Sequence, residues 1–152
     1  MPSFRTTRKV RHSAKEMFDL VADIESYPQF LPLCVALTVL RKTEAAGVIT
    51  KVARMSVGYR AIRETFTTRV SCDPAKREIF VTYIDGPFRH LENRWHFREQ
   101  TPGVCLVEFQ IAYEFKSHAL SLLMGGMFDK AFRKFSEAFE RRADIVYGAP
   151  AA

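Results

Sequence analysis

The sequence has few cysteines and no long apolar run. Its three cysteines, Cys34, Cys72 and Cys105, are odd in number and far apart, so they form neither a CxxC metal knuckle nor a disulfide framework. No apolar stretch approaches the roughly 18 residues that cross a bilayer. Residues 1–16 contain charge but no apolar signal-peptide segment. We therefore expect a protein of the reducing cytoplasm, with at most a peripheral position at the inner membrane.

The common motifs of enzyme sites are also missing. The chain has no GxGxxG, GxxxxGK[ST], GxSxG or HExxH pattern. His90 and His96 share a strand face, but six residues separate them by roughly 20 Å, which is too far for one metal ion. His12 and His118 stand alone near the ends of predicted elements. These absences predict no catalytic set and no metal site.

Phenylalanine, in contrast, is abundant. The chain has 13 Phe among 152 residues, and 47% of its residues are hydrophobic. Phe fills a large volume and has no hydrogen-bonding group, so such a surplus suits either a solid core or an apolar pocket. No linker, repeat or low-complexity stretch divides the chain. We expect one domain over residues 1–147 and a frayed tail over 148–152.

The N-terminal part predicts a strand followed by two short helices. Residues 3–11 alternate as a strand with one basic face. Ser13 and Glu16 have the spacing of a helix capping box, and apolar residues then recur at helical spacing from Met17 to Ile24. Prolines in the segment 26–32 predict a short second helix or a turn there.

Six further strands and a helix follow. Turns with Gly, Pro or Asp recur through this region and are typical of an antiparallel meander. The predicted strands are 35–42, 48–57, 59–72, 77–84, 88–98 and 104–115. From Ser117 to Tyr147 the period becomes helical, and we expect Gly125-Gly126 to let the first turn of this helix move. The order predicts an α+β fold in which a curved antiparallel sheet of about six to seven strands wraps around one long C-terminal helix.

Alternation within the strands predicts which side chains face inward. The inward set on the strands is Ile62, Phe66, Val70, Leu91, Asn93, Trp95, Phe97, Cys105, Val107, Phe109, Ile111, Tyr113 and Phe115. The same parity places Glu64 and Thr68 inside, and a carboxylate in that position must be paired or neutral. Glu64 then either pairs with a neighbouring Arg or hydrogen-bonds a polar ligand head. Asn93 has the same two interpretations, a core hydrogen bond or a ligand contact.

The net charge of +6 lies mostly on the predicted strands. Residues 1–12 contain four basic and no acidic groups, and residues 39–98 contain twelve basic and six acidic groups. Such a surface favours an anionic partner, either lipid headgroups or RNA, or else serves only solubility. Most aromatics share strand parity with aliphatic residues and so point away from Arg and Lys. This pattern speaks against sequence-specific nucleic-acid recognition.

One segment of the sequence indicates which fold family the chain resembles. Residues 21–34, VADIESYPQFLPLC, resemble the V-x-D-[IV]-E-x-Y-P-x-F-[LV]-P-x-C motif of the coenzyme-Q-binding family of the START-like, or helix-grip, superfamily. Residues 63–70, RETFTTRV, and 86–88, GPF, fit the same pattern. The resemblance covers roughly residues 3–147. The family also includes a bacterial ribosome-association toxin branch.

The resemblance implies a cavity that accepts a polyisoprenoid quinone, first of all ubiquinone, and a carrier or chaperone role in respiration. On this interpretation the protein is not an enzyme and requires no cofactor. The toxin branch implies a second possibility, a regulator that binds a ribosomal subunit and blocks subunit association. More distant START-like proteins are polyketide cyclases or aromatases, for which Glu64 is the best acid–base candidate here. Expected partners are therefore a small hydrophobic ligand, an anionic membrane or a ribosomal subunit.

The ligand would lie between the sheet and the helix. The segment from Tyr27 to Leu33 would guard the entrance, and the flexible methionines would suit an irregular ligand surface. The expected ligand-binding residues are Phe30, Leu31, Met55, Glu64, Phe66, Leu91, Trp95, Phe109, Tyr113, Met124, Met127, Phe128 and Phe132.

Overall fold

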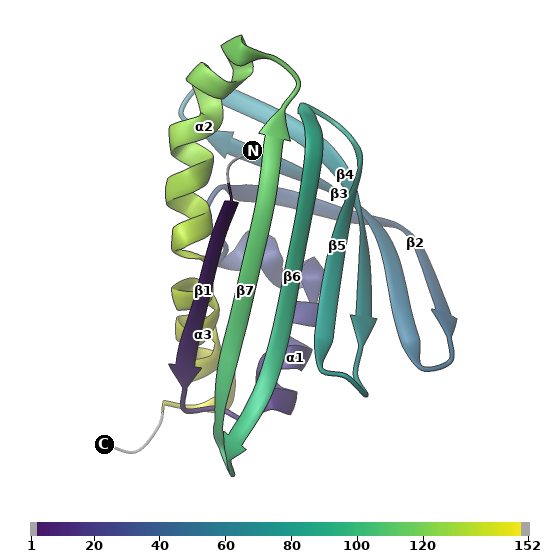
Figure 1. Ribbon diagram of the computed structural model, residues 1–152, viewed down its shortest axis with the longest axis vertical. Helices are drawn as coiled ribbons and strands as arrows, with labels where there is room; N and C mark the ends of the chain where they lie inside the picture. Colours follow the sequence, from purple (N-terminus) through teal and green to yellow (C-terminus); the bar gives the residue numbers. More distant parts are fainter. Residues whose placement is uncertain (1–2, 150–152) are drawn as a thin grey trace.

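Seven strands form one antiparallel sheet in the computed structural model, which describes residues 3–149 (Figure 1). The strand order is β1-β7-β6-β5-β4-β3-β2, so β2 to β7 form a meander and β1 returns to pair with β7. The strands are β1 (Ser3–Val10), β2 (Cys34–Ala45), β3 (Val48–Tyr59), β4 (Ile62–Asp73), β5 (Glu78–Asp85), β6 (Phe88–Thr101) and β7 (Val104–Phe115). All seven predicted strands are confirmed. Of the expected tail, residues 150–152 lie outside the described part of the chain.

Two short helices connect β1 to β2, as predicted. Helix α1 (Ala14–Ala22) begins at a capping box in which the Ser13 hydroxyl accepts from the Glu16 amide and the Glu16 carboxylate accepts from the Ser13 amide. Its apolar stripe, Met17, Leu20 and Val21, is buried. The 3-10 helix η1 (Ile24–Gln29) follows at the proline-punctuated segment.

The C-terminal helical segment is divided at Lys134, where one continuous helix was predicted. Helix α2 (His118–Arg133) ends there, and the Lys134 amide donates to the Ala131 carbonyl, three residues back. Helix α3 (Phe135–Tyr147) begins immediately afterwards. The break lets α2 follow β7 while α3 packs against α1 (Figure 1). Within residues 3–149, no helix is long and apolar enough to cross a membrane.

Gly86, in the turn between β5 and β6, is required by close packing. Its φ is +143°, and a Cβ atom at this position would lie 2.5 Å from the Cβ of Phe66. Any other residue would therefore push the β5–β6 turn away from β4. This contact explains in physical terms why glycine precedes Pro87 and Phe88.

Aromatic rings fill much of the space between the sheet and the helices. The largest fully buried side chains include Phe88, Phe97, Phe109, Phe128 and Phe139. Phe139 of α3 lies 5.2 Å from the Trp95 ring of β6, centroid to centroid, in an edge-to-face arrangement. The phenylalanine surplus thus serves a solid core over much of this space, and only part of the interior remains open.

Candidate ligand-binding cavity

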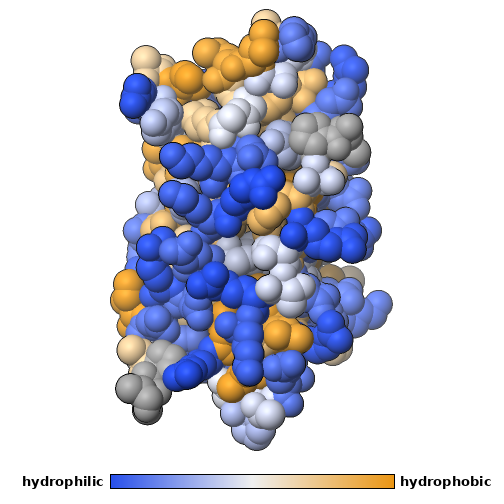
Figure 2. All heavy atoms as spheres, turned by 60° about the vertical axis from the view of Figure 1, so that its left-hand side comes forward, coloured by the Kyte–Doolittle hydropathy of each residue, from blue (hydrophilic) through white to orange (hydrophobic). Residues whose placement is uncertain are grey.

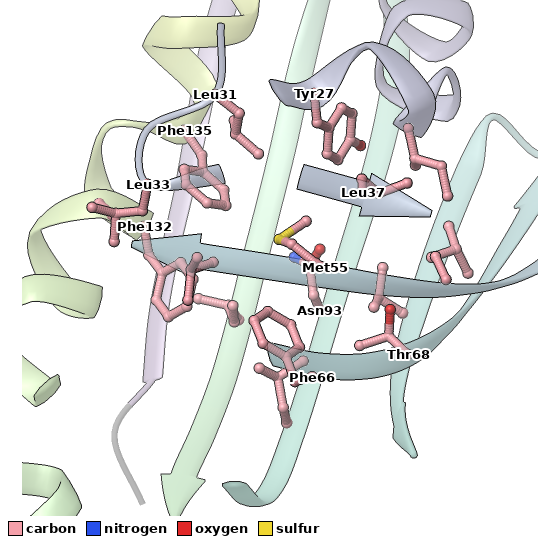
Figure 3. Close-up of a pocket in the computed structure, with 18 of the residues that line it drawn as sticks. Tyr27, Leu31, Leu33, Leu37, Met55, Phe66, Thr68, Asn93, Phe132 and Phe135 are labelled. Carbon is pink, nitrogen blue, oxygen red and sulfur yellow. The ribbon is translucent and has the colours of Figure 1, made fainter. Parts of the chain in front are cut away.

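The open part of the interior is a cavity of about 90 Å³ between the sheet, η1 and the C-terminal helices (Figure 3). Its walls are almost entirely apolar. The lining residues are Ile24, Tyr27, Leu31, Pro32, Leu33, Leu37, Ala53, Met55, Val57, Phe66, Thr68, Val70, Ile79, Val81, Leu91, Asn93, Trp95, Ile111, Phe128, Ala131, Phe132, Phe135 and Phe139. This lining contains no carboxylate, imidazole, ammonium or thiol group. It can therefore solvate an apolar molecule but offers no strong acid or base.

Asn93 is the principal polar group of the cavity wall. Its Nδ2 donates to the Gln110 carbonyl over 2.9 Å, and its Oδ1 accepts from Trp95 Nε1 over 3.0 Å. A carboxamide has two N–H groups and two acceptor lone pairs, so one donor and one acceptor position remain. The core hydrogen-bonding interpretation of Asn93 is therefore confirmed. The ligand contact stays a prediction, for which one donor and one acceptor position remain.

Thr68 and Tyr27 are the other hydroxyl groups of the lining. Thr68 is buried, and its hydroxyl makes no hydrogen bond to any residue in the range 3–149. The Tyr27 hydroxyl, in contrast, donates to the Val21 carbonyl at the end of α1. Burial raises the pKa of Tyr27 well above its usual value, so this phenol stays neutral. Thr68 is thus the hydroxyl that is available to a ligand.

Polar contacts at both ends hold the η1 wall of the cavity in place. Lys51 Nζ of β3 lies 2.7 Å from the Glu25 carboxylate. Burial opposes ionisation of Glu25, but the hydrogen bond from Lys51, a backbone hydrogen bond and the charges of Lys51 and Lys42 together outweigh it, so the pKa of Glu25 is lowered. At the other end, Arg142 of α3 donates to the Gln29 side chain over 2.6 Å.

Seven of the expected ligand-binding residues line the cavity. They are Leu31, Met55, Phe66, Leu91, Trp95, Phe128 and Phe132. Figure 3 shows Met55, Phe66 and Phe132 pointing into the same space from two strands and α2. Their role as ligand contacts stays a prediction, but the fold does bring them together.

The other six expected residues lie outside the lining. They are Phe30, Glu64, Phe109, Tyr113, Met124 and Met127. The Phe109 ring packs 4.6 Å from Trp95, and the Tyr113 ring packs 5.1 Å from Phe132, so both belong to the solid core. Met124 is fully buried and Met127 partly so. Phe30 packs under the guanidinium of Arg142.

Glu64 was expected to face the cavity, and this prediction is wrong. Its parity is inward, but β4 pairs with β5 only from Thr67 onward, so the start of β4 projects beyond its neighbour. Glu64 is therefore half-buried at the end of the sheet and forms no ion pair within the described chain. The best acid–base candidate does not reach the cavity.

Several lining residues were not selected from the sequence. Phe135 and Phe139 lie in the predicted C-terminal helical segment, and Leu37 lies in the predicted strand 35–42. Those signals existed but did not separate cavity wall from solid core. Leu33 had no such signal, because it lies in the connection between η1 and β2. Its own φ is +69°, and its side chain lines the cavity because of the direction that this connection takes.

A second hollow, of about 280 Å³, lies on the outer face of the sheet over β1, β5, β6 and β7. Arg5, Arg94 and His96 line it together with Phe80 and the carboxylates of Glu78 and Glu108. The Arg94 guanidinium lies 4.0 Å from the centre of the Phe80 ring. This surface, which we call the outer groove, combines cations with an aromatic side chain, whereas the cavity is uncharged.

The family of the chain follows from comparison with known proteins. A model described as polyketide cyclase/dehydrase and lipid transport matches residues 10–140. The chain belongs to this family.

Two relatives represent the two branches that the sequence resemblance indicated. Ribosome association toxin RatA of Escherichia coli strain K12 is 36% identical over 149 residues, which cover 98% of this chain and 91% of that protein. Coenzyme Q-binding protein COQ10 homolog B, mitochondrial, of Xenopus laevis is 31% identical over 140 residues, which cover 90% of this chain and 55% of that protein. The predicted family membership is confirmed.

Solved structures show the same fold. The 18 kDa protein CC1736 from Caulobacter crescentus superposes with a TM-score of 0.78 at 33% identity, covering 98% of this chain and 100% of that chain. A START superfamily protein from Mycobacterium smegmatis gives a TM-score of 0.78 at 22% identity, covering 95% and 98% of the two chains. The predicted helix-grip fold is confirmed.

Proposed function

We propose that this protein binds an isoprenoid quinone, first of all ubiquinone, in the cavity and carries it for respiration without changing it covalently. The observation that supports this most directly is the lining itself. An apolar wall suits a polyisoprenoid chain, and Asn93 and Thr68 supply hydrogen-bonding groups for a quinone carbonyl. The description of the family, which includes lipid transport, and the coenzyme Q-binding relative agree with this assignment.

The ligand must widen the cavity as it enters. About 90 Å³ is less than the roughly 150 Å³ apolar cavity that holds benzene in an engineered protein. The side chain best suited to give way is Met55, which is unbranched and half-buried. We therefore expect binding to be slow and to depend on movement of α2 away from β3, because α2 packs mainly on β7 and α3.

Trp95 allows a direct test, because it is the single tryptophan of the chain and lines the cavity. Titration with a short-chain ubiquinone should quench its fluorescence to saturation at a one-to-one ratio. Solvent extraction of the freshly purified protein, followed by mass spectrometry, should identify a co-purified quinone. The proposal fails if extraction repeatedly finds no quinone and titration leaves the fluorescence unchanged.

A cavity-filling variant provides the matched control. Ala131 of α2 lines the cavity, so Ala131→Leu should occupy space that the ligand needs and weaken quinone binding roughly tenfold or more. Ala112 has outward parity on β7, and Ala112→Leu makes the same chemical change away from the cavity. Equal loss of binding in the two variants would contradict the cavity assignment.

A regulator that binds the ribosome is the second candidate. It is supported by 36% identity over 149 residues with a ribosome association toxin and by the cations of the outer groove. It predicts co-sedimentation with ribosomal subunits that weakens steeply with salt, and growth arrest on overexpression. Reversing Arg5, Lys9 and Arg11 to Glu should abolish co-sedimentation and leave the Trp95 titration intact. Arg141→Glu, on exposed α3, is the control for a general charge effect.

A cyclase activity is the weakest of the three. It needs an acid or base beside the substrate, and Glu64, the residue that the sequence offered for this role, does not line the cavity. Unchanged turnover of a candidate polyketide by Glu64→Gln would remove that residue from consideration.

A further inference from the structure

The N-terminal two-thirds of α2 has an unusual composition for an exposed helix. Residues 117–128 contain no Asp, Glu, Lys or Arg. Nevertheless Leu122 is 74% exposed and Leu123 is 61% exposed. Ala119 and Gly126 are exposed as well, and these four positions follow the i, i+3, i+4, i+7 spacing of one helix face. A helix face that met only water would normally contain charged residues.

This apolar face lies at one end of the molecule, together with the β3–β4 and β5–β6 turns and the junction of β7 with α2. Strands β3, β5 and β7 finish at this end, because the meander is antiparallel. Figure 2 shows hydrophobic residues gathered at the top of the view, where α2 begins, beside hydrophilic ones. We call this end, with Leu122 and Leu123, the α2 tip.

Four cationic side chains lie at the same end of the molecule as the α2 tip. Arg60 lies in the β3–β4 turn, Arg63 follows it, and Arg89 and Lys116 flank the junction of β7 with α2. All four are exposed, and Arg60, Arg63 and Lys116 form no ion pair within residues 3–149. The carboxylates at this end are Asp85, the half-buried Glu64 and Glu114, and Glu114 lies 3.5 Å from Arg89.

The opposite end of the molecule is different. It also has exposed apolar residues, Ile145 at 73% and Val146 at 49%. The next residue, Tyr147, donates its hydroxyl to the Glu16 carbonyl of α1 over 3.1 Å, so these apolar residues stand close to the start of α1. The carboxylate of Asp19 at this end is itself paired with Lys15 over 2.6 Å, so anions and cations are mixed there.

We propose that the α2 tip docks on an anionic lipid bilayer, with Leu122 and Leu123 inserted among the acyl chains and the four cations against the headgroups. Exposed apolar side chains at the same end of a molecule as exposed cations have the chemistry of an interfacial anchor. The uncharged stretch of α2 is about 16 Å long, too short to span a bilayer of about 30 Å, so the helix lies in the interface.

The cavity lies close to the α2 tip, so docking would bring the cavity to a membrane. This part of the inference rests on the proposed function. A polyisoprenoid quinone dissolves in a bilayer and not in water, so a carrier must load it at a membrane. Leu33 and Val57 line the cavity next to the β3–β4 turn, and the Gly58 amide donates to the Leu33 carbonyl over 2.9 Å. The tip would therefore bring the cavity to the source of its ligand.

Co-sedimentation with lipid vesicles tests the docking on the full chain. Vesicles of phosphatidylglycerol and phosphatidylethanolamine, without quinone, should pellet the wild type, and vesicles of phosphatidylcholine alone should pellet much less. Leu122→Ser with Leu123→Ser should reduce binding roughly tenfold or more. Arg60→Glu with Lys116→Glu should reduce it about fivefold or more on the anionic vesicles. Ile145→Ser with Val146→Ser is the matched control and should bind as the wild type does.

Three results would overturn the proposal. The variant with Leu122→Ser and Leu123→Ser could bind vesicles as well as the wild type does. The control variant with Ile145→Ser and Val146→Ser could lose as much vesicle binding as the tip variant. The wild type could also sediment with ribosomal subunits but not with vesicles, and lose the ribosome when Leu122 and Leu123 are changed, which would assign the tip to the ribosome.

Titration of Trp95 with a short-chain quinone separates this failure from a failure of the proposed function. Quinone binding without vesicle binding removes only the docking, and vesicle binding without quinone binding removes only the cavity ligand.

Discussion

The Trp95 indole donates its N–H to the side-chain oxygen of Asn93, two residues earlier on the same face of β6, over 3.0 Å. Asn93 in turn donates to the Gln110 carbonyl of β7 over 2.9 Å. One carboxamide therefore satisfies the only indole of the chain, ties β6 to β7 inside the cavity wall and keeps hydrogen-bonding capacity for a ligand. We therefore expect Asn93 to contribute both to the stability of the fold and to the proposed ligand binding.

Asn93→Leu should affect both properties. The substitution leaves the Trp95 N–H without its partner in a buried setting, which should lower the free energy of unfolding by about 1–3 kcal/mol. It should also weaken quinone binding, because the polar contact is lost. Urea unfolding and the Trp95 titration measure the two effects. Thr68→Val is the comparison, since the Thr68 hydroxyl has no hydrogen bond within residues 3–149, and it should leave stability nearly unchanged. Wild-type stability in Asn93→Leu would contradict this account.

Phe139→Ala should be among the most destabilising single changes. The side chain is 1% exposed, and its ring centroid lies 5.3 Å from Tyr27, 5.1 Å from Phe30 and 5.2 Å from Trp95. Loss of this ring should cost about 3–5 kcal/mol of unfolding free energy and loosen η1. Phe80→Ala on the outer face, where the ring is half-buried, should cost clearly less, and the two unfolding curves make the comparison.

The three cysteines should be unreactive in the native protein. Burial raises the pKa of Cys34 and of Cys72 to about 11 and that of Cys105 to about 12. The thiolate is the nucleophile, so at pH 8 a pKa of 11 instead of 9.0 means about 100-fold less reactive species. Alkylation should be slow in buffer and should reach all three thiols in denaturant. Fast native labelling of any one of them would refute the prediction.

The contact between Glu25 and Lys51 should make stability depend on acid pH. The pKa of Glu25 is lower in the folded state than its usual value of 4.5. A lowered folded-state pKa stabilises the protein above the unfolded-state pKa, and this contribution is lost as pH falls through the folded-state pKa. The melting temperature of the wild type should exceed that of Glu25→Gln at neutral pH, and the difference should shrink below pH 4.5. A difference that is constant with pH would exclude the ion pair as its cause.

Much of the fold is predictable because it depends on neighbouring residues. The Ser13 and Glu16 side chains cap α1 within one turn, and strand parity identified Phe66 and Trp95 as inward-facing. The break at Lys134 was not predictable in this way. The apolar stripe continues through it, and only the different packing partners of α2 and α3 reveal it.

The candidate site was predictable only in part. Parity separates the two faces of a strand, but it does not separate a residue that fills the core, such as Phe109, from one that borders an opening, such as Phe66. Glu64 shows the same limit at a strand end. Its parity is inward, but the neighbouring strand stops before it, so no wall forms there.

The sequence by itself determined the strands, the caps, the inward faces and the family, because each of these depends on local spacing or on a contiguous motif. The tertiary structure alone decided where the interior stays open. That outcome depends on how far each strand extends beyond its neighbour and on where the C-terminal helix breaks. It also depends on which rings meet across the sheet, as Phe139 meets Trp95. These are relations between segments distant in the chain, and packing volume, which no local pattern encodes, settles them.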